Sequence, residues 1–370
     1  MSLTGQQVGK YRIGPLIGEG GMAEVYMGEQ AGGMMARRVA IKVVSREHCQ
    51  NAEVVNRMKN EARALGKIRH PGVVEVFDVL TTMDGRLCII MEFLQGKTLR
   101  GWLDERGRIS VQEALFVVIQ LVDALAAAHD VAIIHRDVKP DNCFVIVDQA
   151  GNVHTKLVDF GIAKLVGDGG LVQTGASAKM GTAAYMPPEQ FRSPKDVDHR
   201  TDQYSVGCML FEMLTGQTPF PAKNLVQAMQ AHAYQPPPAL RSLLPGASAG
   251  LEQVMNKLLA KTPFERFNNM RELKQALEVI QAGGEPNVHA PPPTGGHQPI
   301  TTGAHGAAHH HTGHPGHHTG HPGHHTGHPG HHTGHGPAVQ QGSGKSLALI
   351  LMIVAVLVAV GAGAVIAFVI

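Results

Sequence analysis

The chain has few cysteines and almost no net charge. Cys49, Cys88, Cys143 and Cys208 are scattered and form no CxxC pair, so the sequence implies neither a zinc site nor a disulfide framework. The formal net charge of +2 is too small to suggest a nucleic-acid partner, and no run of basic residues interleaved with aromatic ones occurs. We therefore interpret the cysteines as small core residues of a reduced cytosolic domain that does not bind nucleic acid.

A signal-peptide core is also missing, because residues 1–10 are polar. Composition divides the 370 residues into three parts. Residues 1–282 mix apolar, charged and aromatic residues in globular proportions, residues 283–346 are dominated by Gly, Pro, His and Thr, and residues 347–370 contain no charged residue. This division predicts a globular domain, a spacer and an apolar terminal segment.

A series of short motifs runs through the globular part. In chain order they are Gly18-x-Gly20-x-x-Ala23-x-Val25, Val39-Ala40-Ile41-Lys42, Glu61 in a helical stretch, His135-Arg136-Asp137-Val138-Lys139-Pro140-Asp141-Asn142, Asp159-Phe160-Gly161 and Pro187-Pro188-Glu189. The set resembles that of the bacterial branch of the eukaryotic-type (Hanks-type) serine/threonine protein kinases, over roughly Val8 to Ala282. The resemblance implies an α+β bilobal fold with a small β-rich N-lobe that has one helix, about residues 8–93, and a larger α-helical C-lobe, about residues 94–282.

The first motif reads as a hairpin with glycines at its tip, between strand-like runs at Tyr11–Ile17 and Glu24–Gly28. Glycines there let backbone N–H groups approach phosphate oxygens without interference from a Cβ. Lys42 lies in an otherwise apolar strand, where a lysine is costly unless it meets an anion. By resemblance, Lys42 contacts the α- and β-phosphates of ATP and pairs with Glu61 of a helix predicted over Ala52–Ile68; a solvated helix carboxylate is the other interpretation of Glu61.

The resemblance also implies an adenine pocket. The buried strand Leu87–Met91 leads into a hinge whose backbone meets the adenine, and Met91 is the gatekeeper residue. Val25 and Ala40 are expected to cover the adenine from above and Phe144 from below. The residues implied for ATP binding are Ile17, Gly18, Glu19, Gly20, Gly21, Met22, Ala23, Val25, Ala40, Lys42, Glu61, Met91, Glu92, Leu94 and Phe144.

The catalytic loop is expected to follow a long apolar helix at Val111–His129. By resemblance, Asp137 orients or deprotonates the incoming hydroxyl and Lys139 stabilises the transferring phosphate. Asn142 and Asp159 are implied as ligands of Mg²⁺, which prefers hard oxygen donors. His135 is interpreted as a packing residue, with a role as a base as the alternative.

Other residues are expected to support this loop. Cys143–Val158 predicts a hairpin that turns at Asp148–Asn152. The remaining implied contacts are Thr182 with Asp137 and Lys139, Glu189 with Arg266, and Asp202 with the back of the catalytic loop. The sequence departs from the family pattern at Ala23, Val138 and Pro187, none of which removes a charged or metal-binding group.

Regulation by phosphorylation is implied by Arg136, a cation beside Asp137 that could pair with a phosphate. The segment Leu171–Met180 offers Thr174 and Ser177 as candidate phosphosites, and we favour Thr174. Since a chain cannot easily fold this segment into its own active site, we expect autophosphorylation in trans.

The spacer contains three identical copies of His-His-Thr-Gly-His-Pro-Gly at residues 310–330 and an imperfect copy that ends at Pro337. Glycine and proline in every copy exclude a coiled coil, and the segment has no apolar side chains to bury. We interpret it as a disordered linker. The alternative is a tract that binds divalent metal or responds to pH, because imidazoles are common metal ligands and titrate near pH ~6.5.

Leu347–Ile370 is a stretch of 24 uncharged, mostly apolar residues, long enough to form a transmembrane helix. Lys345 stands just before it, which places the globular domain on the cytoplasmic side of a membrane, and we expect no sensor domain beyond the span. Small residues recur every four positions at Ala355, Ala359, Gly363 and Ala367, a pattern that favours a homodimer.

The expected function is that of an ATP- and Mg²⁺-dependent, non-specific serine/threonine protein kinase tethered to the cytoplasmic face of a membrane, with proteins as substrates. One alternative is a catalytically weak scaffold with the same fold, which the presence of Lys42, Asp137, Asn142 and Asp159 opposes. A second alternative is a metal- or pH-responsive binding protein in which the His-rich tract is primary.

Overall fold

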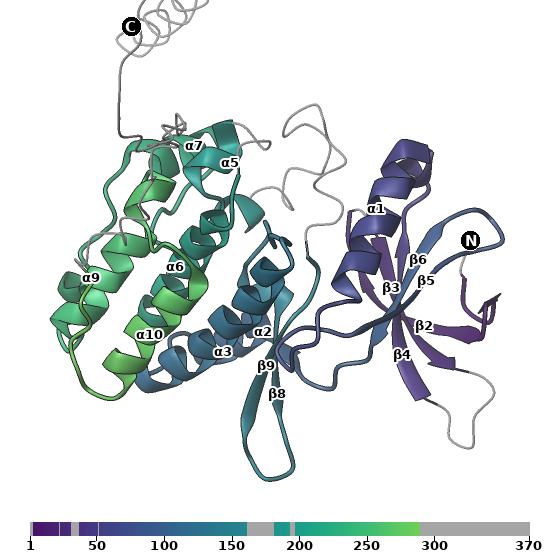
Figure 1. Ribbon diagram of the computed structural model, residues 1–370, viewed down its shortest axis with the longest axis horizontal. Coiled ribbons are helices and arrows are strands. Elements are labelled where there is room, and N and C mark those ends of the chain that lie inside the picture. Colours follow the sequence, from purple (N-terminus) through teal and green to yellow (C-terminus); the bar gives the residue numbers. More distant parts are fainter. Residues whose placement is uncertain are drawn as a thin grey trace, which may run out of the picture. The chain divides into compact units, whose positions relative to one another are not determined.

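The computed structural model describes residues 3–21, 23–30, 37–50, 52–160, 181–192 and 197–288, all within one structural unit, Met1–Gly296. The His-rich repeats of the predicted linker, residues 310–337, and the predicted membrane segment, residues 347–370, lie outside the described residues. The α+β bilobal architecture predicted from the sequence is confirmed for the part that is described (Figure 1).

The N-lobe is an antiparallel sheet in the order β1-β2-β3-β4-β6-β5, with helix α1 (Ala52–Leu65) beside it (Figure 1). Helix α1 is preceded by the short 3-10 helix η1 (Glu47–Cys49). The strands are β1 (Gln7–Val8), β2 (Tyr11–Glu19), β3 (Ala23–Gln30), β4 (Arg37–Val44), β5 (Val76–Thr81) and β6 (Leu87–Glu92).

Strand β4 shows how this sheet positions the site. Its side chains alternate between the two faces of the sheet. Val39, Ile41 and Val43 are fully buried in one apolar cluster, on the face that does not carry the chemistry. Ala40 and Lys42 therefore face the other side, where Ala40 joins a second cluster that includes residues of both lobes. Shifting the register of β4 by one residue would bury Lys42 and expose the core.

The C-lobe is mainly helical and contains a small sheet in the order β7-β8-β9. Its elements are β7 (Lys97–Thr98), α2 (Leu99–Arg106), α3 (Val111–Asp130), η2 (Pro140–Asn142), β8 (Cys143–Val147), β9 (Val153–Leu157), α5 (Pro188–Arg192), α6 (Arg200–Thr215), α7 (Leu225–Tyr234), α8 (Leu240–Leu243), α9 (Ala249–Leu258), η4 (Pro263–Glu265) and α10 (Met270–Gln281). The predicted hairpin over Cys143–Val158 is therefore confirmed as β8 and β9.

Helix α6 is the central element of the C-lobe, since every residue from Thr201 to Leu214 is buried. Such a helix needs no amphipathic face because other elements surround it. It carries two buried carboxylates, Asp202 in its first turn and Glu212 near its last turn. Asp202 accepts hydrogen bonds from the catalytic loop, and Glu212 accepts one from Tyr185 in the loop that contains Thr182.

Helix α3 begins at a capping box, in which Ser110 accepts from the backbone N–H of Glu113 and the Glu113 side chain accepts from the backbone N–H of Ser110. Among the described residues, α3 is the one helix that is long and apolar enough to cross a membrane. Its apolar residues pack in the main core of the C-lobe, where Leu121 and Leu125 are fully buried. Leu121→Ala would cost about 2–5 kcal/mol of stability.

The two lobes share a seam of backbone hydrogen bonds. The N–H of Leu157 in β9 donates to the carbonyl of Gly72 at 2.8 Å, and the N–H of Val74 donates to the carbonyl of Leu157 at 3.0 Å. Val73 and Leu157 thus form a parallel bridge between the segment that follows α1 and the C-lobe sheet.

Packed residues reach beyond both ends of the predicted domain, Val8 to Ala282. Leu3 is only 1% exposed and joins the N-lobe core, and Val288 is 7% exposed and joins the C-lobe core. The Nζ of Lys257 donates to the carbonyl of Val288 at 2.9 Å. A truncation at residue 282 would therefore remove part of the C-lobe core.

Candidate active site

The glycine-rich hairpin lies between β2 and β3. Gly18 pairs with Val25, Glu19 pairs with Glu24, and the N–H of Gly20 donates to the carbonyl of Ala23 at 2.9 Å. Ala23, which replaces a glycine of the family pattern, is the first residue of β3, so its extended backbone tolerates a methyl group.

The apolar residues predicted to surround adenine come together in one cluster. Ala40 and Met91 are buried partners in the register of β4 and β6, and Val25, Leu94 and Phe144 pack against the same cluster. Val158, which precedes Asp159, also belongs to it. Val158 was not predicted for this cluster, although its position directly before the Asp159-Phe160-Gly161 motif was a usable signal. The remaining implied residues Ile17, Gly18, Glu19, Gly20 and Gly21 lie in the hairpin and Glu92 ends β6.

The side chain of Glu92 belongs to the hinge itself. Its Oε2 accepts a hydrogen bond from the Nζ of Lys156 in β9 at 2.7 Å and one from the backbone N–H of Glu75 at 3.4 Å. This contact ties the last residue of β6 to the C-lobe sheet. Lys156 was missed in the sequence because the two residues lie 64 positions apart.

Lys42 reaches across the space between the lobes. Its Nζ lies 2.7 Å from Oδ1 of Asp159, with side-chain exposures of 24% and 40%. The predicted partner Glu61 lies in α1, but its side chain is outside the described residues, so the Lys42–Glu61 pair stays a prediction. Since Lys42 pairs in register with Ile89 and Asp159 follows Val158, both members of the apolar cluster, the ion pair lies beside that cluster.

Two residues of the site adopt left-handed backbone conformations. Arg136 has a φ of 61° and Asp159 has a φ of 53°. Such conformations are unfavourable for residues other than glycine and occur where the surrounding structure enforces them, commonly at functional sites. Arg136 directly precedes Asp137, and Asp159 is itself one of the predicted site residues.

The catalytic-loop residues converge on Asp137. Its Oδ2 accepts a hydrogen bond from Nδ2 of Asn142 at 3.0 Å and lies 3.2 Å from Nζ of Lys139. Lys139 also donates to Oγ1 of Thr182 at 2.9 Å, so the contact predicted between Lys139 and Thr182 is present. The arrangement gathers an acid, a cation and an amide around the point where an acceptor hydroxyl would bind.

Asp202 holds this loop from behind. Its carboxylate accepts from the backbone N–H groups of His135 at 2.9 Å and Arg136 at 2.8 Å, and from Nε2 of His129 at 2.8 Å. Burial alone would raise the pKa of Asp202, but the hydrogen bond and charge of His129 and the nearby His135 hold that pKa below its usual value. His129 was not singled out from the sequence.

His135 fills a structural position. The ring is fully buried, its Nε2 lies 3.0 Å from the carbonyl of Val158, and its Nδ1 accepts from the N–H of Asp137 at 3.3 Å. Burial lowers the pKa of His135, although neighbouring carboxylates oppose the effect. Both ring nitrogens are engaged with backbone groups, which agrees with the predicted packing role.

The ion pair predicted between Glu189 and Arg266 is also present. Nη1 and Nη2 of Arg266 donate to the two carboxylate oxygens of Glu189 at 2.6 and 2.9 Å, and the Arg266 side chain is 0% exposed. Arg266 further donates to the carbonyls of Ala260 and Arg200. The pair fixes the start of α5, which follows the loop that contains Thr182.

Asn142 and Asp159 are the residues predicted to hold a divalent cation. The Nδ2 of Asn142 donates to both the carbonyl and the carboxylate of Asp137, which leaves its Oδ1 as an acceptor for a cation. One carboxylate and one amide suit a cation that takes its other ligands from phosphates and water. Within the described ranges, no group of three His, Cys, Asp or Glu residues is arranged to hold a metal ion.

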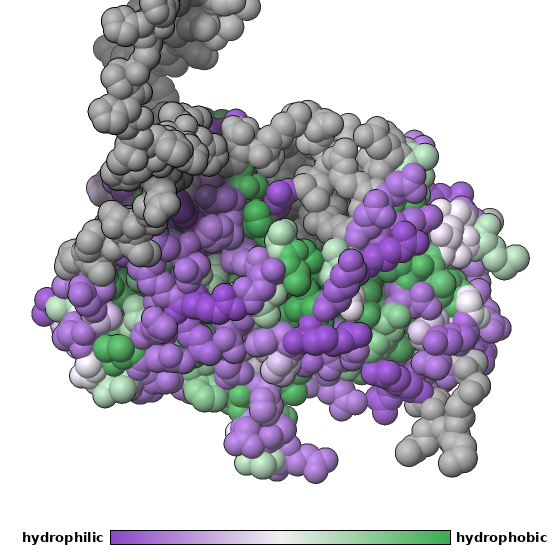
Figure 2. Space-filling view, in the orientation of Figure 1, coloured by the Kyte–Doolittle hydropathy of each residue, from purple (hydrophilic) through white to green (hydrophobic). Residues whose placement is uncertain are grey.

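Several predicted site residues lie outside the described residues: Met22, Gly161, Thr174 and Ser177. The face of the molecule shown in Figure 2 is mostly hydrophilic, with apolar residues visible near its middle.

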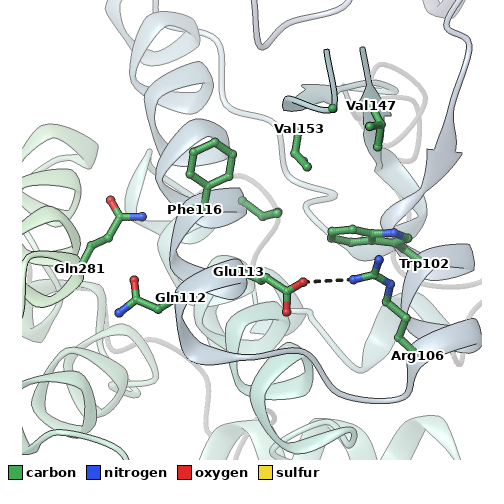
Figure 3. A pocket seen from close by; sticks show the side chains of 10 residues that line it. Trp102, Arg106, Gln112, Glu113, Phe116, Val147, Val153 and Gln281 are labelled. Carbon is green, nitrogen blue, oxygen red and sulfur yellow. Dashed lines mark hydrogen bonds and ion pairs between the residues drawn. The ribbon is translucent and has the colours of Figure 1, made fainter. Parts of the chain in front are cut away.

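A groove of about 530 Å³ lies on a different part of the C-lobe, between α2, α3 and the β8–β9 hairpin (Figure 3). Trp102, Phe116 and Val153 face it, and Arg106 spans one side, with its guanidinium 4.3 Å from the Trp102 ring and 3.1 Å from Glu113. The groove shares no residue with the catalytic loop or the adenine cluster. A much smaller hollow, about 10 Å³, is lined by residues of the catalytic loop and of the loop that contains Thr182, among them Asp137, Thr182 and Tyr185.

Comparisons with known proteins agree with this geometry. Residues 11–278 match the family model of the protein kinase domain. The chain is 39% identical over 280 residues to serine/threonine-protein kinase Pkn1 of Myxococcus xanthus, covering 76% of this chain and 39% of that protein. It is 35% identical over 280 residues to serine/threonine-protein kinase PknB of Mycobacterium tuberculosis, covering 75% of this chain and 44% of that protein.

The crystal structure of the Mycobacterium tuberculosis PknI kinase domain superimposes with a TM-score of 0.60 at 26% identity, covering 76% of this chain and 100% of that one. The chain spans about two fifths of the length of the curated relatives named above, whose shares are 39% and 44%.

Proposed function

This chain belongs to the protein kinase family, and from that premise we propose that it is a serine/threonine protein kinase that transfers the γ-phosphate of ATP to protein hydroxyls. The observation that carries the proposal is the cluster of Asp137, Lys139 and Asn142, together with the Lys42–Asp159 pair. Phosphoryl transfer depends on positioning and on charge stabilisation, and this cluster supplies groups for both.

The chemistry follows from the contacts. Asp137 would accept a hydrogen bond from the incoming hydroxyl and orient its oxygen toward the phosphate. Lys139, 3.2 Å from Asp137, would neutralise charge on the transferring group, and Lys42 would do so on the phosphates that remain with the nucleotide. Asn142 and Asp159 would hold a divalent cation, for which we propose Mg²⁺; when bound, this ion neutralises charge on the phosphates.

The decisive experiment is transfer of radiolabelled phosphate from ATP to a protein substrate by the full chain, with Asp137→Asn as the inactive control. We expect transfer by the wild type, confined to Ser and Thr, and a loss of about 100-fold or more in the variant. Equal transfer by both proteins would contradict the role of Asp137. Replacing Mg²⁺ with Ca²⁺, which prefers more ligands and longer distances, tests the choice of metal.

We also propose that activation involves autophosphorylation in trans at Thr174, with Arg136 as the cation that binds the phosphate. The proximity of Arg136 to Asp137 in the chain supports this, since an ordered phosphate there would act directly on the catalytic loop. Mass spectrometry of the active enzyme should find phosphate on Thr174, and Thr174→Ala should be less active than Ser177→Ala. Active enzyme that carries phosphate on neither residue would contradict the proposal.

The location is a further proposal. The 24 uncharged residues of Leu347–Ile370, preceded by Lys345, support a single-pass anchor with the kinase domain in the cytoplasm. We propose that residues 283–346 connect the two mainly as a spacer, with metal or proton binding by the His-rich repeats as the competing role. Protease protection in sealed vesicles tests the orientation, and deletion of residues 310–337 tests whether Ni²⁺ or Zn²⁺ binding belongs to the repeats.

A further inference from the structure

Tyr185 is held at both its ends by residues far away in the chain. Its hydroxyl donates to Oε2 of Glu212 at 2.5 Å and accepts from Nη2 of Arg100 at 2.5 Å. Its backbone carbonyl accepts from Oγ of Ser205 at 2.8 Å. Tyr185 is only 4% exposed, so its hydrogen bond to Glu212 is shielded from water. Burial, followed by the charge and hydrogen bond of Glu212, raises the pKa of Tyr185, and the hydroxyl stays a donor at neutral pH.

Arg100 and Glu212 form the frame that holds this hydroxyl. Nη1 of Arg100 donates to Oε1 of Glu212 at 2.9 Å and Nη2 donates to Oε2 at 3.3 Å, which makes the pair bidentate. The side-chain exposures are 30% for Arg100 and 10% for Glu212. A pair with this geometry fixes direction as well as distance, which a single lysine contact would not do. Asp104, one turn later in α2, lies 3.7 Å from Arg100.

The Tyr185 hydroxyl is coupled to the catalytic loop through a short stretch of chain. Thr182, three residues earlier, accepts from Lys139, which in turn lies 3.2 Å from Asp137. Asp137, Thr182 and Tyr185 line the same small hollow. A shift of Tyr185 would therefore move the surface against which an acceptor residue must rest beside Asp137. Displacements of about 1 Å at such a surface can cost about 100-fold in rate.

Arg100 is also close to the nucleotide side of the site. It lies two residues after Thr98, whose side chain caps α2 by accepting from the N–H of Gly101 at 3.1 Å. Thr98 pairs in register with Phe144 of the adenine cluster. Helix α2 thus starts at the floor of the nucleotide pocket and carries Arg100 to the acceptor loop.

We propose that Arg100, acting through Glu212 and the hydroxyl of Tyr185, is a positioning residue that holds the loop of residues 181–187 for the protein substrate. The inference rests on the proposed kinase function. It assigns to the three residues an effect on the acceptor, while the nucleotide is bound by other groups. The positions of these residues in the sequence do not indicate this role, since Arg100 and Glu212 are 112 positions apart.

The test uses Tyr185→Phe, which removes the hydroxyl and keeps the buried ring. In the full chain, kcat/KM for a Ser/Thr peptide is expected to fall about tenfold, because the variant loses one charge-assisted hydrogen bond. The KM for ATP and the slow hydrolysis of ATP without peptide should stay at wild-type values. In hydrolysis the acceptor is water, which does not need the loop of residues 181–187 to position it. Arg100→Gln should act in the same way, and Arg100→Lys should recover part of the loss.

Arg106→Gln is the matched control, because Arg106 lies on the same helix and forms an exposed ion pair with Glu113 outside the site. It should leave all three measurements unchanged. The double variant Arg100→Gln/Tyr185→Phe should have a kcat/KM for peptide little below that of either single variant. Each single substitution already disrupts the same hydrogen-bonded group, so the losses should not add.

The proposal is overturned if Tyr185→Phe retains wild-type kcat/KM for peptide, or if peptide transfer and ATP hydrolysis fall together, which marks a general structural defect. Strictly additive losses in the double variant would also overturn it. Absence of phosphate transfer by the wild-type chain, by contrast, would refute the proposed kinase function and this role with it.

Discussion

Lys42 and Asp159 meet at 2.7 Å although 117 residues separate them in the chain. One comes from a strand of the N-lobe and the other follows the C-lobe sheet, so their contact joins the two lobes at the site of the proposed chemistry. The lysine proposed to bind phosphates is therefore in direct contact with the carboxylate proposed to bind metal. Removing either should affect the reaction more than the fold.

The first prediction concerns this pair. Asp159→Asn is expected to lower phosphoryl transfer by about 100-fold or more and to weaken ATP binding much less, because it removes charge that stabilises the reacting phosphates. Lys42→Met is expected to be nearly inactive. Initial rates of transfer and the Kd for ATP check both variants, and circular dichroism checks that each is folded. Near wild-type turnover in either variant would show that the assignment is wrong.

The second prediction concerns the buried pair of Glu189 and Arg266. Glu189→Gln leaves the fully buried Arg266 without its anion and should reduce the free energy of unfolding by about 3–5 kcal/mol. The matched control is Lys97→Ala, which breaks an ion pair with Glu105 whose side chains are 59% and 56% exposed, and should cost less than about 1 kcal/mol. Urea unfolding measures both. Equal effects in the two variants would refute the distinction between the buried and the exposed pair.

The third prediction concerns pH. His232 is fully buried and its Nδ1 lies 2.9 Å from the Tyr204 hydroxyl. Burial, and then repulsion by Lys261, lowers the pKa of His232 to about 3. The unfolded chain binds a proton at this residue below pH ~6.5, whereas the folded chain does not until the pH approaches that lowered value. This contribution to stability is therefore complete above pH ~6.5 and is lost progressively as the pH falls.

His232→Gln should consequently flatten the pH dependence of the free energy of unfolding by up to about 1.4 kcal/mol per pH unit below pH ~6. Above pH ~7 the wild type and the variant should have parallel profiles, which serves as the internal control. Urea unfolding over this range provides the measurement. Parallel profiles at every pH would mean that His232 takes up its proton equally in both states.

The fourth prediction concerns the proposed membrane segment. If Ala359 and Gly363 lie on a face that pairs two helices, replacing both with Leu should lower autophosphorylation in membranes several-fold, because a lower local concentration slows a reaction in trans. Val354→Leu with Val358→Leu, off that face, is the control. Phosphate incorporation is compared at matched membrane density. Equal rates in the two double variants would show that the small-residue face does not drive activation.

The sequence predicted best what lies within a few residues along the chain. Asp137, Lys139 and Asn142 fall within one short motif, and their contacts are local consequences of that loop. The role of Arg100 had no such signal, because a single arginine on a polar helix face is ordinary. Leu3 and Val288 were missed because one apolar residue beside a polar segment forms no periodic pattern, and only the completed core shows where each is buried.

The bridge between Val73 and Leu157 limits how the two lobes can move. Because the segment that follows α1 is hydrogen-bonded into the C-lobe sheet on both sides of Val73, the lobes cannot simply separate to release a nucleotide. They would instead rotate about this seam, with the glycine hairpin swinging farthest and the seam barely moving. In hydrogen exchange, the amides of Val74 and Leu157 should accordingly stay protected while strands at the tip of the N-lobe exchange.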